Sequence, residues 1–129
     1  MCCDSRARYL RHGNEFRSVD GTPDILRSIV NDWYGGDWYA MAEEYYGLIG
    51  NLYEKTRCRV IAHFDLIEKF NEDGALFDRN NPRYRAVALG ALERLYAADY
   101  IVIAVCRCVG PVILLHAAEN LDLPGIGRL

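Results

Sequence analysis

Two short apolar segments constrain the fold of this chain more than any other feature. Residues 58–62 and 101–105 are rich in valine and isoleucine, and each is about as long as an average strand. A stretch with helical periodicity separates them. Because parallel neighbouring strands need a long crossover, usually a helix, this order predicts a parallel sheet covered by helices. The sequence therefore favours an α/β fold.

Clear start and stop signals mark a helix in the first third of the chain. Thr22 has the side chain of a helix N-cap, and Pro23 suits the first helical position that follows it. Apolar residues then recur every three or four positions until Gly35 and Gly36. We expect the helix to end at this glycine pair, because glycine readily adopts the conformations that terminate helices.

Two further helices are predicted downstream. Asp37 is placed to cap a helix over residues 38–55, and Pro82 opens another over residues 83–97. Residues 1–21 are polar and basic and show little periodicity, so no regular element is predicted there.

The composition is that of one globular domain. The 129 residues are 51% hydrophobic and 26% charged, which excludes a disordered tail or a collagen-like fibre. The net charge of −3 lacks the basic footprint of a nucleic-acid-binding protein. The apolar run over residues 100–118 is interrupted by Arg107, Gly110 and Pro111, so no membrane span is predicted.

The cysteines indicate a reducing compartment. Cys2, Cys3, Cys58, Cys106 and Cys108 are odd in number and irregularly spaced, whereas a secreted disulfide framework uses pairs. We therefore expect a cytoplasmic protein. Half of a zinc site at Cys106 and Cys108 is disfavoured, because the sequence offers no second pair of ligands at the usual spacing.

The most distinctive candidate site is the pair His63 and Asp65, which directly follows the first apolar segment. Residues two apart on an extended chain face the same side, so both side chains can share one cavity. An imidazole and a carboxylate there suit a divalent metal, or the carboxylate orients the imidazole. The alternative is a histidine bonded to a backbone carbonyl, with Asp65 capping the next turn. A polar loop is expected over residues 71–81.

Other polar and aromatic residues have simpler interpretations. His12 lies in a polar stretch and is typical of a solvated loop histidine, whereas His116 lies in an apolar run and is typical of a packed one. Glu43 and Glu44 are adjacent on a predicted helix, where neighbours point about 100° apart, so a solvated face is the simplest interpretation. The aromatic residues of the first two predicted helices have helical spacing, which favours core packing for most of them.

Two separate segments resemble one enzyme family. Residues 60–71, V-I-A-H-F-D-L-I-E-K-F-N, are similar to the G-H-x-D-L-I-x-K-[FY] segment of histidinol-phosphatases. Residues 9–21 resemble the family segment that continues into F-x-S-V-D-G, and an E-Y-Y helix (residues 44–46) lies between the two matches. These enzymes belong to the polymerase-and-histidinol-phosphatase (PHP) superfamily of metal-dependent phosphoesterases.

The resemblance implies a portion of a distorted seven-stranded (β/α) barrel of PHP type, whose strand ends hold two or three divalent metal ions (Zn, Mn or Fe). It implies hydrolysis of histidinol phosphate to histidinol and phosphate in histidine biosynthesis, with the cations neutralising the developing charge. His63 matches a metal-binding histidine and Asp65 a catalytic carboxylate that supports the site. Lys69 matches a basic position that contacts the phosphate, and His12 is a second candidate for substrate binding.

The chain also departs from the family pattern at both flanks. Arg8 stands where the family has a metal-binding histidine, and a guanidinium cannot bind a metal. The family's H-x-H pair and its D-x-H pair are absent. A barrel of this kind takes roughly 250 residues. We therefore expect a single partial domain, family-like over about residues 9–102, with out-of-frame or wrongly joined flanks at residues 1–8 and about 103–129. Little or no activity is expected from these residues alone.

Two other functions remain open from the sequence. One is a small non-enzymatic α/β binding module that uses the aromatic helix as its interaction face. The other is a different PHP-type phosphoesterase, although the D-L-I-x-K-F segment favours the histidinol-phosphatase branch. The sequence does not indicate an oligomeric state.

Overall fold

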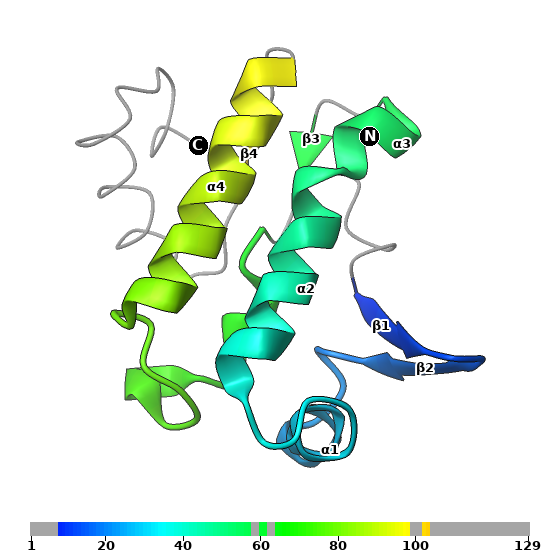
Figure 1. Cartoon of the computed structure of the whole chain (residues 1–129), viewed down its shortest axis with the longest axis vertical. Helices are drawn as coiled ribbons and strands as arrows, with labels where there is room; N and C mark the ends of the chain where they lie inside the picture. Colours follow the sequence, from blue (N-terminus) through cyan, green and yellow to red (C-terminus); the bar gives the residue numbers. More distant parts are fainter. Residues whose placement is uncertain (1–7, 58–59, 62–63, 99–101, 104–129) are drawn as a thin grey trace.

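The computed structural model describes residues 8–57, 60–61, 64–98 and 102–103 (Figure 1). Within these residues the chain forms an N-terminal hairpin, four α-helices, two 3-10 turns and a pair of short strands. His63, His116 and all five cysteines lie outside the described residues, and so do most of the two atypical flanks.

Helix α1 spans Pro23–Trp33 and confirms the predicted start and stop. The Thr22 hydroxyl accepts a hydrogen bond from the backbone N–H of Ile25 at 3.1 Å, which is the bond expected of an N-cap. Gly35 and Gly36 follow with φ angles of 61° and 85°. Glycine adopts these left-handed conformations without steric cost, and they end the helix.

Helix α2 spans Trp38–Gly50 and is followed by the short helix α3, Leu52–Thr56. The Asp37 carboxylate caps α2 as predicted, because it accepts hydrogen bonds from two backbone N–H groups of the first turn at 3.0 and 3.2 Å. The prediction of one continuous helix over residues 38–55 is wrong at Asn51. There the backbone N–H bonds to the carbonyl three residues before it, which tightens the last turn and ends α2.

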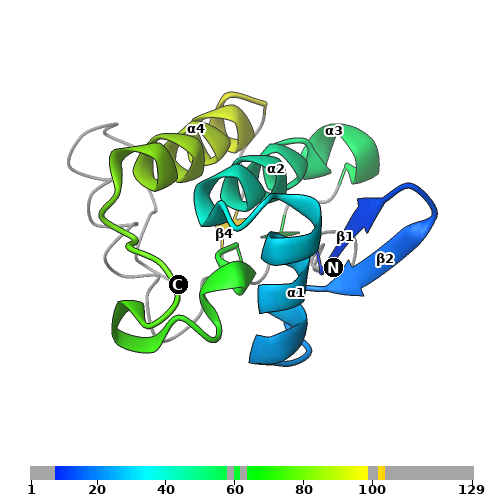
Figure 2. The ribbon, with the colours of Figure 1, turned by 60° about the horizontal axis from the view of Figure 1, so that its bottom comes forward.

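Helix α4 spans Pro82–Ala98, close to the predicted bounds. The Asn81 side chain accepts a hydrogen bond from the backbone N–H of Arg83 at 2.9 Å. Figures 1 and 2 show α4 running beside α2. Its buried side chains recur at helical spacing and face the core: Tyr84, Ala88, Ala91, Leu92 and Leu95.

Strands β3, Val60–Ile61, and β4, Val102–Ile103, pair in parallel. The order β3, α4, β4 confirms that a helix connects two parallel strands, within the described parts of the two predicted segments. The strand pair lies beneath α2 and α4 (Figure 2). A barrel of seven strands remains a prediction.

An antiparallel hairpin, strands β1 Tyr9–His12 and β2 Glu15–Ser18, occupies the stretch where no regular element was predicted. Gly13 lies in the turn with a φ of 61°, which glycine tolerates without strain. The alternation of apolar and polar residues that marks a strand is weak here, because the hairpin buries few side chains. Phe16 is 62% exposed, whereas Leu10 is fully buried.

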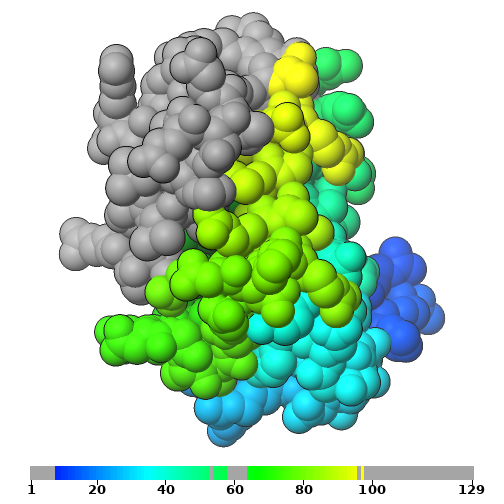
Figure 3. Space-filling view, turned by 60° about the vertical axis from the view of Figure 1, so that its left-hand side comes forward, coloured from blue at the N-terminus to red at the C-terminus, as the bar shows by residue number. Residues whose placement is uncertain are grey.

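The core lies between α1, α2, α4 and the segment that follows β3. It contains the following fully buried large side chains: Leu10, Leu26, Ile29, Met41, Tyr45, Tyr46, Ile49, Phe64, Ile67, Tyr84 and Leu92. On the face shown in Figure 3, α4 and the segment before it lie next to α2. Among the described residues, no helix combines the length and the apolar character that crossing a membrane requires.

Candidate functional site

The segment after β3 turns into the protein instead of running along its surface. The 3-10 turn η1, Leu66–Glu68, is closed by a hydrogen bond from the backbone N–H of Glu68 to the carbonyl of Asp65 at 2.9 Å. A second turn follows, in which the N–H of Asn71 bonds to the carbonyl of Glu68 at 3.0 Å. Residues three apart lie above one another in such turns. The turns therefore place Asp65, Glu68 and Asn71 along one side of the segment.

These three residues are the buried polar or charged side chains of the described part of the chain. Each is fully shielded from solvent. Removing a charge or an amide from water is costly unless hydrogen bonds or opposite charges compensate, so their partners decide how this region holds together.

Asn71 is the centre of the hydrogen-bond network. Its Nδ2 donates to Glu68 Oε1 at 2.8 Å and to the carbonyl of Phe77 at 3.0 Å. Its Oδ1 accepts from the backbone N–H groups of Leu76 and Phe77 at 2.8 and 3.0 Å. The amide thus uses both donors and both acceptor positions, which ties the following loop to the buried turn.

Arg79 compensates the buried charge of Glu68. Its Nη2 donates to the carbonyl of Asn71 at 2.8 Å, and its Nε lies 3.5 Å from each carboxylate oxygen of Glu68. Burial nevertheless raises the pKa of the Glu68 carboxyl, and the nearby charge of Asp65 acts in the same direction. Asn71 and Arg79 lower this pKa and only partly offset the effect of burial.

Three tyrosines from the two long helices cover this segment. The hydroxyl groups of Tyr46 on α2 and Tyr84 on α4 are 2.7 Å apart, and their rings meet edge to face. Tyr45 donates its hydroxyl proton to the carbonyl of Phe64 at 2.9 Å and accepts from the N–H of Leu66 at 3.1 Å. Burial raises the pKa of the phenols of Tyr46 and Tyr84, so both stay protonated.

Asp65, predicted as the catalytic carboxylate, lies in this buried region. The alternative that its side chain caps the next turn is wrong, because no side-chain cap bond forms at the start of η1. The backbone N–H of Leu66, the first residue of η1, is bonded to the Tyr45 hydroxyl. The predicted metal ligand His63 lies outside the described residues, so its geometry relative to Asp65 stays a prediction.

Lys69 lies at the surface, one turn beyond the buried acids. Its Nζ donates to the backbone carbonyl of Asp20 at 3.0 Å and lies 5.2 Å from the centre of the Phe70 ring. The Asp20 carboxylate is in turn held by Arg8 at 3.3 Å and by the Ser18 hydroxyl at 2.6 Å. Lys69 therefore joins the segment after β3 to the chain that leaves β2.

His12 lies at the turn end of the hairpin, whereas Lys69 contacts the chain at the other end. It pairs with Glu15 beside the turn, whereas Asp20 follows the opposite end, where Tyr9 pairs with Ser18. The imidazole stacks on the Trp33 ring of α1 with centroids 5.4 Å apart. The structure thus gives His12 a packing contact and places Lys69 at the opposite end of the hairpin.

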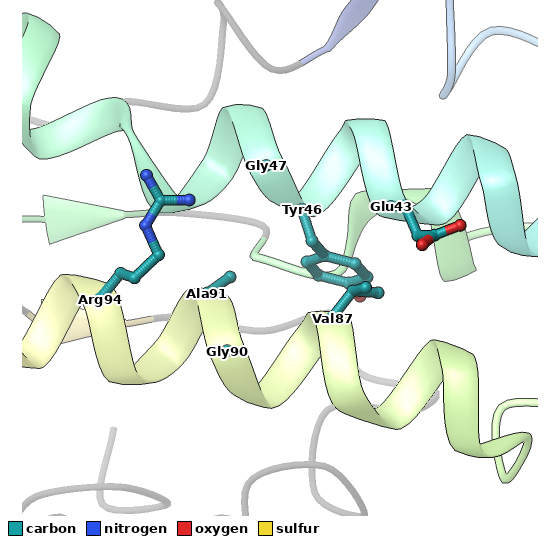
Figure 4. A pocket seen from close by; sticks show the side chains of 7 residues that line it. All are labelled: Glu43, Tyr46, Gly47, Val87, Gly90, Ala91 and Arg94. Carbon is teal, nitrogen blue, oxygen red and sulfur yellow. The ribbon is translucent and has the colours of Figure 1, made fainter.

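A shallow groove of about 230 Å³ lies between α2 and α4 (Figure 4). Its lining is Glu43, Tyr46, Gly47, Val87, Gly90, Ala91 and Arg94. Ligand pockets are usually larger, roughly 300 to 1,000 Å³. The two charged residues at its ends already have partners, since Glu43 pairs with Arg83 at 2.6 Å and Arg94 bonds to Asn51. The groove is therefore a weaker candidate than the buried acids.

The residues that sequence reasoning missed are Glu68, Asn71, Arg79 and Tyr84. The three-residue spacing of Asp65, Glu68 and Asn71 is a signal that could have found the first two, because it places polar groups on one side of a tight turn. In the described part of the chain, no group of three or more histidine, cysteine, aspartate or glutamate side chains is arranged to hold a metal ion.

The side of α2 that carries Tyr45 and Tyr46 faces the interior of the protein. Tyr45 and Tyr46 are buried, which agrees with the interpretation of core packing and leaves them no face for a binding partner.

Comparison with known proteins adds no further constraint: no family model, curated protein or solved structure matches the chain at a significant level.

Proposed function

We propose that this chain carries the strand-end segment of a metal-dependent phosphatase that acts on histidinol phosphate. The observation that carries the proposal is the hydrogen bond of 3.0 Å between Lys69 and the carbonyl of Asp20, residues 49 positions apart in the chain. It joins the two segments that separately resemble the histidinol-phosphatases. A shared site would bring these two segments together.

The position of the segment supports the same proposal. In α/β folds, functional side chains collect where parallel strands end at their carboxyl termini. Asp65 and Lys69 both follow β3, which is paired in parallel with β4. One is a buried acid and the other an exposed cation, so the segment offers a carboxylate inside and a positive charge at the surface.

His63 and Asp65 supply two of the several ligand groups that a divalent metal ion needs. The His63 imidazole and the Asp65 carboxylate are the residues that would hold it, because nitrogen and carboxylate oxygen are the usual ligands of Zn²⁺ and Mn²⁺ in proteins. A divalent cation, when bound, supplies charge neutralisation at a phosphate and lowers the pKa of water. Within the described residues, Asp65 belongs to no group of three or more histidine, cysteine, aspartate or glutamate side chains that could hold the ion.

The role of Lys69 follows from its own contacts. Its ammonium group has three N–H donors, and one of them is used on the Asp20 carbonyl. The side chain is exposed, so the other donors can bind the oxygens of a phosphate monoester, for which a charge-assisted hydrogen bond is stronger than a neutral one.

Release of inorganic phosphate from histidinol phosphate tests the proposal. With Mn²⁺ or Zn²⁺ present we expect slow release, removal of the activity by EDTA, and a KM increase of about tenfold in Lys69→Ala with a smaller change in kcat, because one charge-assisted contact is lost. No metal-dependent release with either ion, together with no binding of Mn²⁺ to the chain, would contradict the proposal. Faster release from adenosine monophosphate than from histidinol phosphate would move the chain to a different phosphoesterase branch.

A further inference from the structure

The backbone around Asp65 is buried and irregular. Phe64, Asp65 and Ile67 are fully shielded from solvent, and Asp65 has φ and ψ angles of −105° and 41°, outside the helical and extended regions. Backbone polar groups in such a place have no water to bond with, so each needs a partner within the protein. Leu66 is the first residue of η1, and its N–H has no partner inside that turn.

A single oxygen atom supplies partners on both sides of Asp65. The Tyr45 hydroxyl donates to the carbonyl of Phe64 at 2.9 Å and accepts from the N–H of Leu66 at 3.1 Å. The first group belongs to the peptide unit before Asp65 and the second to the peptide unit after it. Rotation about φ or ψ of Asp65 would therefore break one of these bonds, and these two angles set the direction in which the carboxylate leaves the backbone.

Tyr45 is itself firmly held. It lies on α2, is fully buried, and packs edge to face against the Tyr46 ring with centroids 5.0 Å apart and an interplanar angle of 82°. The Asp65 carboxylate makes no side-chain cap bond at the start of η1, so the hydrogen bonds of the Tyr45 hydroxyl hold the peptide units on both sides of Asp65.

We propose that Tyr45 is a positioning residue that fixes the backbone of Asp65, and through it the direction of the Asp65 carboxylate. The proposal rests on the phosphatase function for its catalytic consequence, whereas its structural content stands on the two hydrogen bonds. Tyr45 does not touch the substrate in this account and acts only through Asp65.

The test compares Tyr45→Phe with Tyr46→Phe. Both variants remove one buried hydroxyl from adjacent positions of α2 and keep the ring, but the Tyr46 hydroxyl bonds to Tyr84 and not to the segment. Tyr45→Phe loses both hydrogen bonds of this hydroxyl. We expect the Leu66 amide, which takes part in one of them, to exchange with solvent about tenfold faster, and kcat to fall at least about tenfold with little change in KM. The carbon-13 shift of the Asp65 carboxyl at fixed pH should also change. Tyr46→Phe should leave the exchange of the Leu66 amide near wild type, because the Tyr46 hydroxyl bonds to Tyr84.

Each result decides for or against the proposal. Equal Leu66 exchange in the two variants would overturn it, and so would faster exchange with an unchanged Asp65 signal. If the wild type neither releases phosphate nor binds Mn²⁺, the proposed function fails, but the exchange and the Asp65 signal still decide whether Tyr45 positions the carboxylate. Should Tyr45→Phe not fold, the wild type provides the test: a slowly exchanging Tyr45 hydroxyl proton with a nuclear Overhauser contact to the Leu66 amide supports the proposal, and its absence contradicts it.

Discussion

Replacing Asn71 with alanine should destabilise the fold more than any surface substitution. The side chain is fully buried and makes four hydrogen bonds: one to the Glu68 carboxylate, two to Phe77 and one to Leu76. Alanine removes all four and leaves the partner groups inside the protein. The loop that closes on Asn71 would then lose its attachment to the buried turn.

The size of the loss in the free energy of unfolding depends on how many of these partner groups can bond to water instead. Three of the four bonds are buried, and the fourth, from the partly buried N–H of Leu76, can be replaced by solvent. A buried hydrogen bond contributes about 1 kcal/mol net, and a buried group left without a partner costs about 1 to 3 kcal/mol. We therefore expect Asn71→Ala to lower the free energy of unfolding by roughly 3 kcal/mol, against a total of about 5 to 15 kcal/mol for a typical domain.

Urea denaturation followed by circular dichroism measures this loss. Asn80→Ala is the matched control, because Asn80 is exposed on the same loop, and its change should stay within about 0.5 kcal/mol. The two variants should have similar m-values, so that the difference in midpoint reports stability. A loss below about 1 kcal/mol for Asn71→Ala, or one equal to that of the control, would show that the buried hydrogen bonds of Asn71 do not stabilise this loop.

Three further predictions concern stability. Burial raises the folded-state pKa of Glu68 above its unfolded value, so the free energy of unfolding should fall as the pH rises above that unfolded value. Urea midpoints should show this slope for wild type and a flatter one for Glu68→Gln. The Asp37 pKa is lowered, first by its hydrogen bond with Arg83, so Asp37→Ala should cost about 1 kcal/mol at neutral pH and progressively less as the pH falls below about 4; thermal unfolding at two pH values checks it. Gly90 lies inside α4 with open space around the site of an added Cβ, so Gly90→Ala should raise stability by about 0.8 kcal/mol in the same thermal assay, and an unchanged or lower stability would contradict this.

The elements that could be predicted from sequence are those set by local signals. Thr22 and Asp37 cap their helices, and the apolar stripe that follows each cap is buried as its spacing indicates. The hairpin at residues 9–18 also had a local signal, the Gly13-Asn14 pair between two short polar stretches. It was missed because its strands bury little apolar surface, so the alternation that normally marks a strand is absent.

The site was harder to predict because its character depends on distant partners. Asn71 was expected in a polar loop, and its burial depends on Arg79 and on the loop that folds back over it. Tyr45 looked like a core aromatic residue, which it is, but its hydroxyl acts on a segment about twenty positions away along the chain. Spacing along a helix reveals which face is apolar and does not reveal where a phenolic oxygen will bond.

Phosphate release by Asp65→Asn shows whether the buried carboxylate takes part in a metal-dependent reaction. The amide keeps the size of the buried carboxylate and removes its charge, and Asp73→Asn is the control because Asp73 is exposed in the 3-10 turn η2, Glu72–Gly74. With histidinol phosphate and Mn²⁺, we predict that the first variant loses the slow metal-dependent release, because a carboxylate that would hold the cation is removed, while the second stays near wild type. Equal rates in wild type and Asp65→Asn, with both folded, would contradict the account.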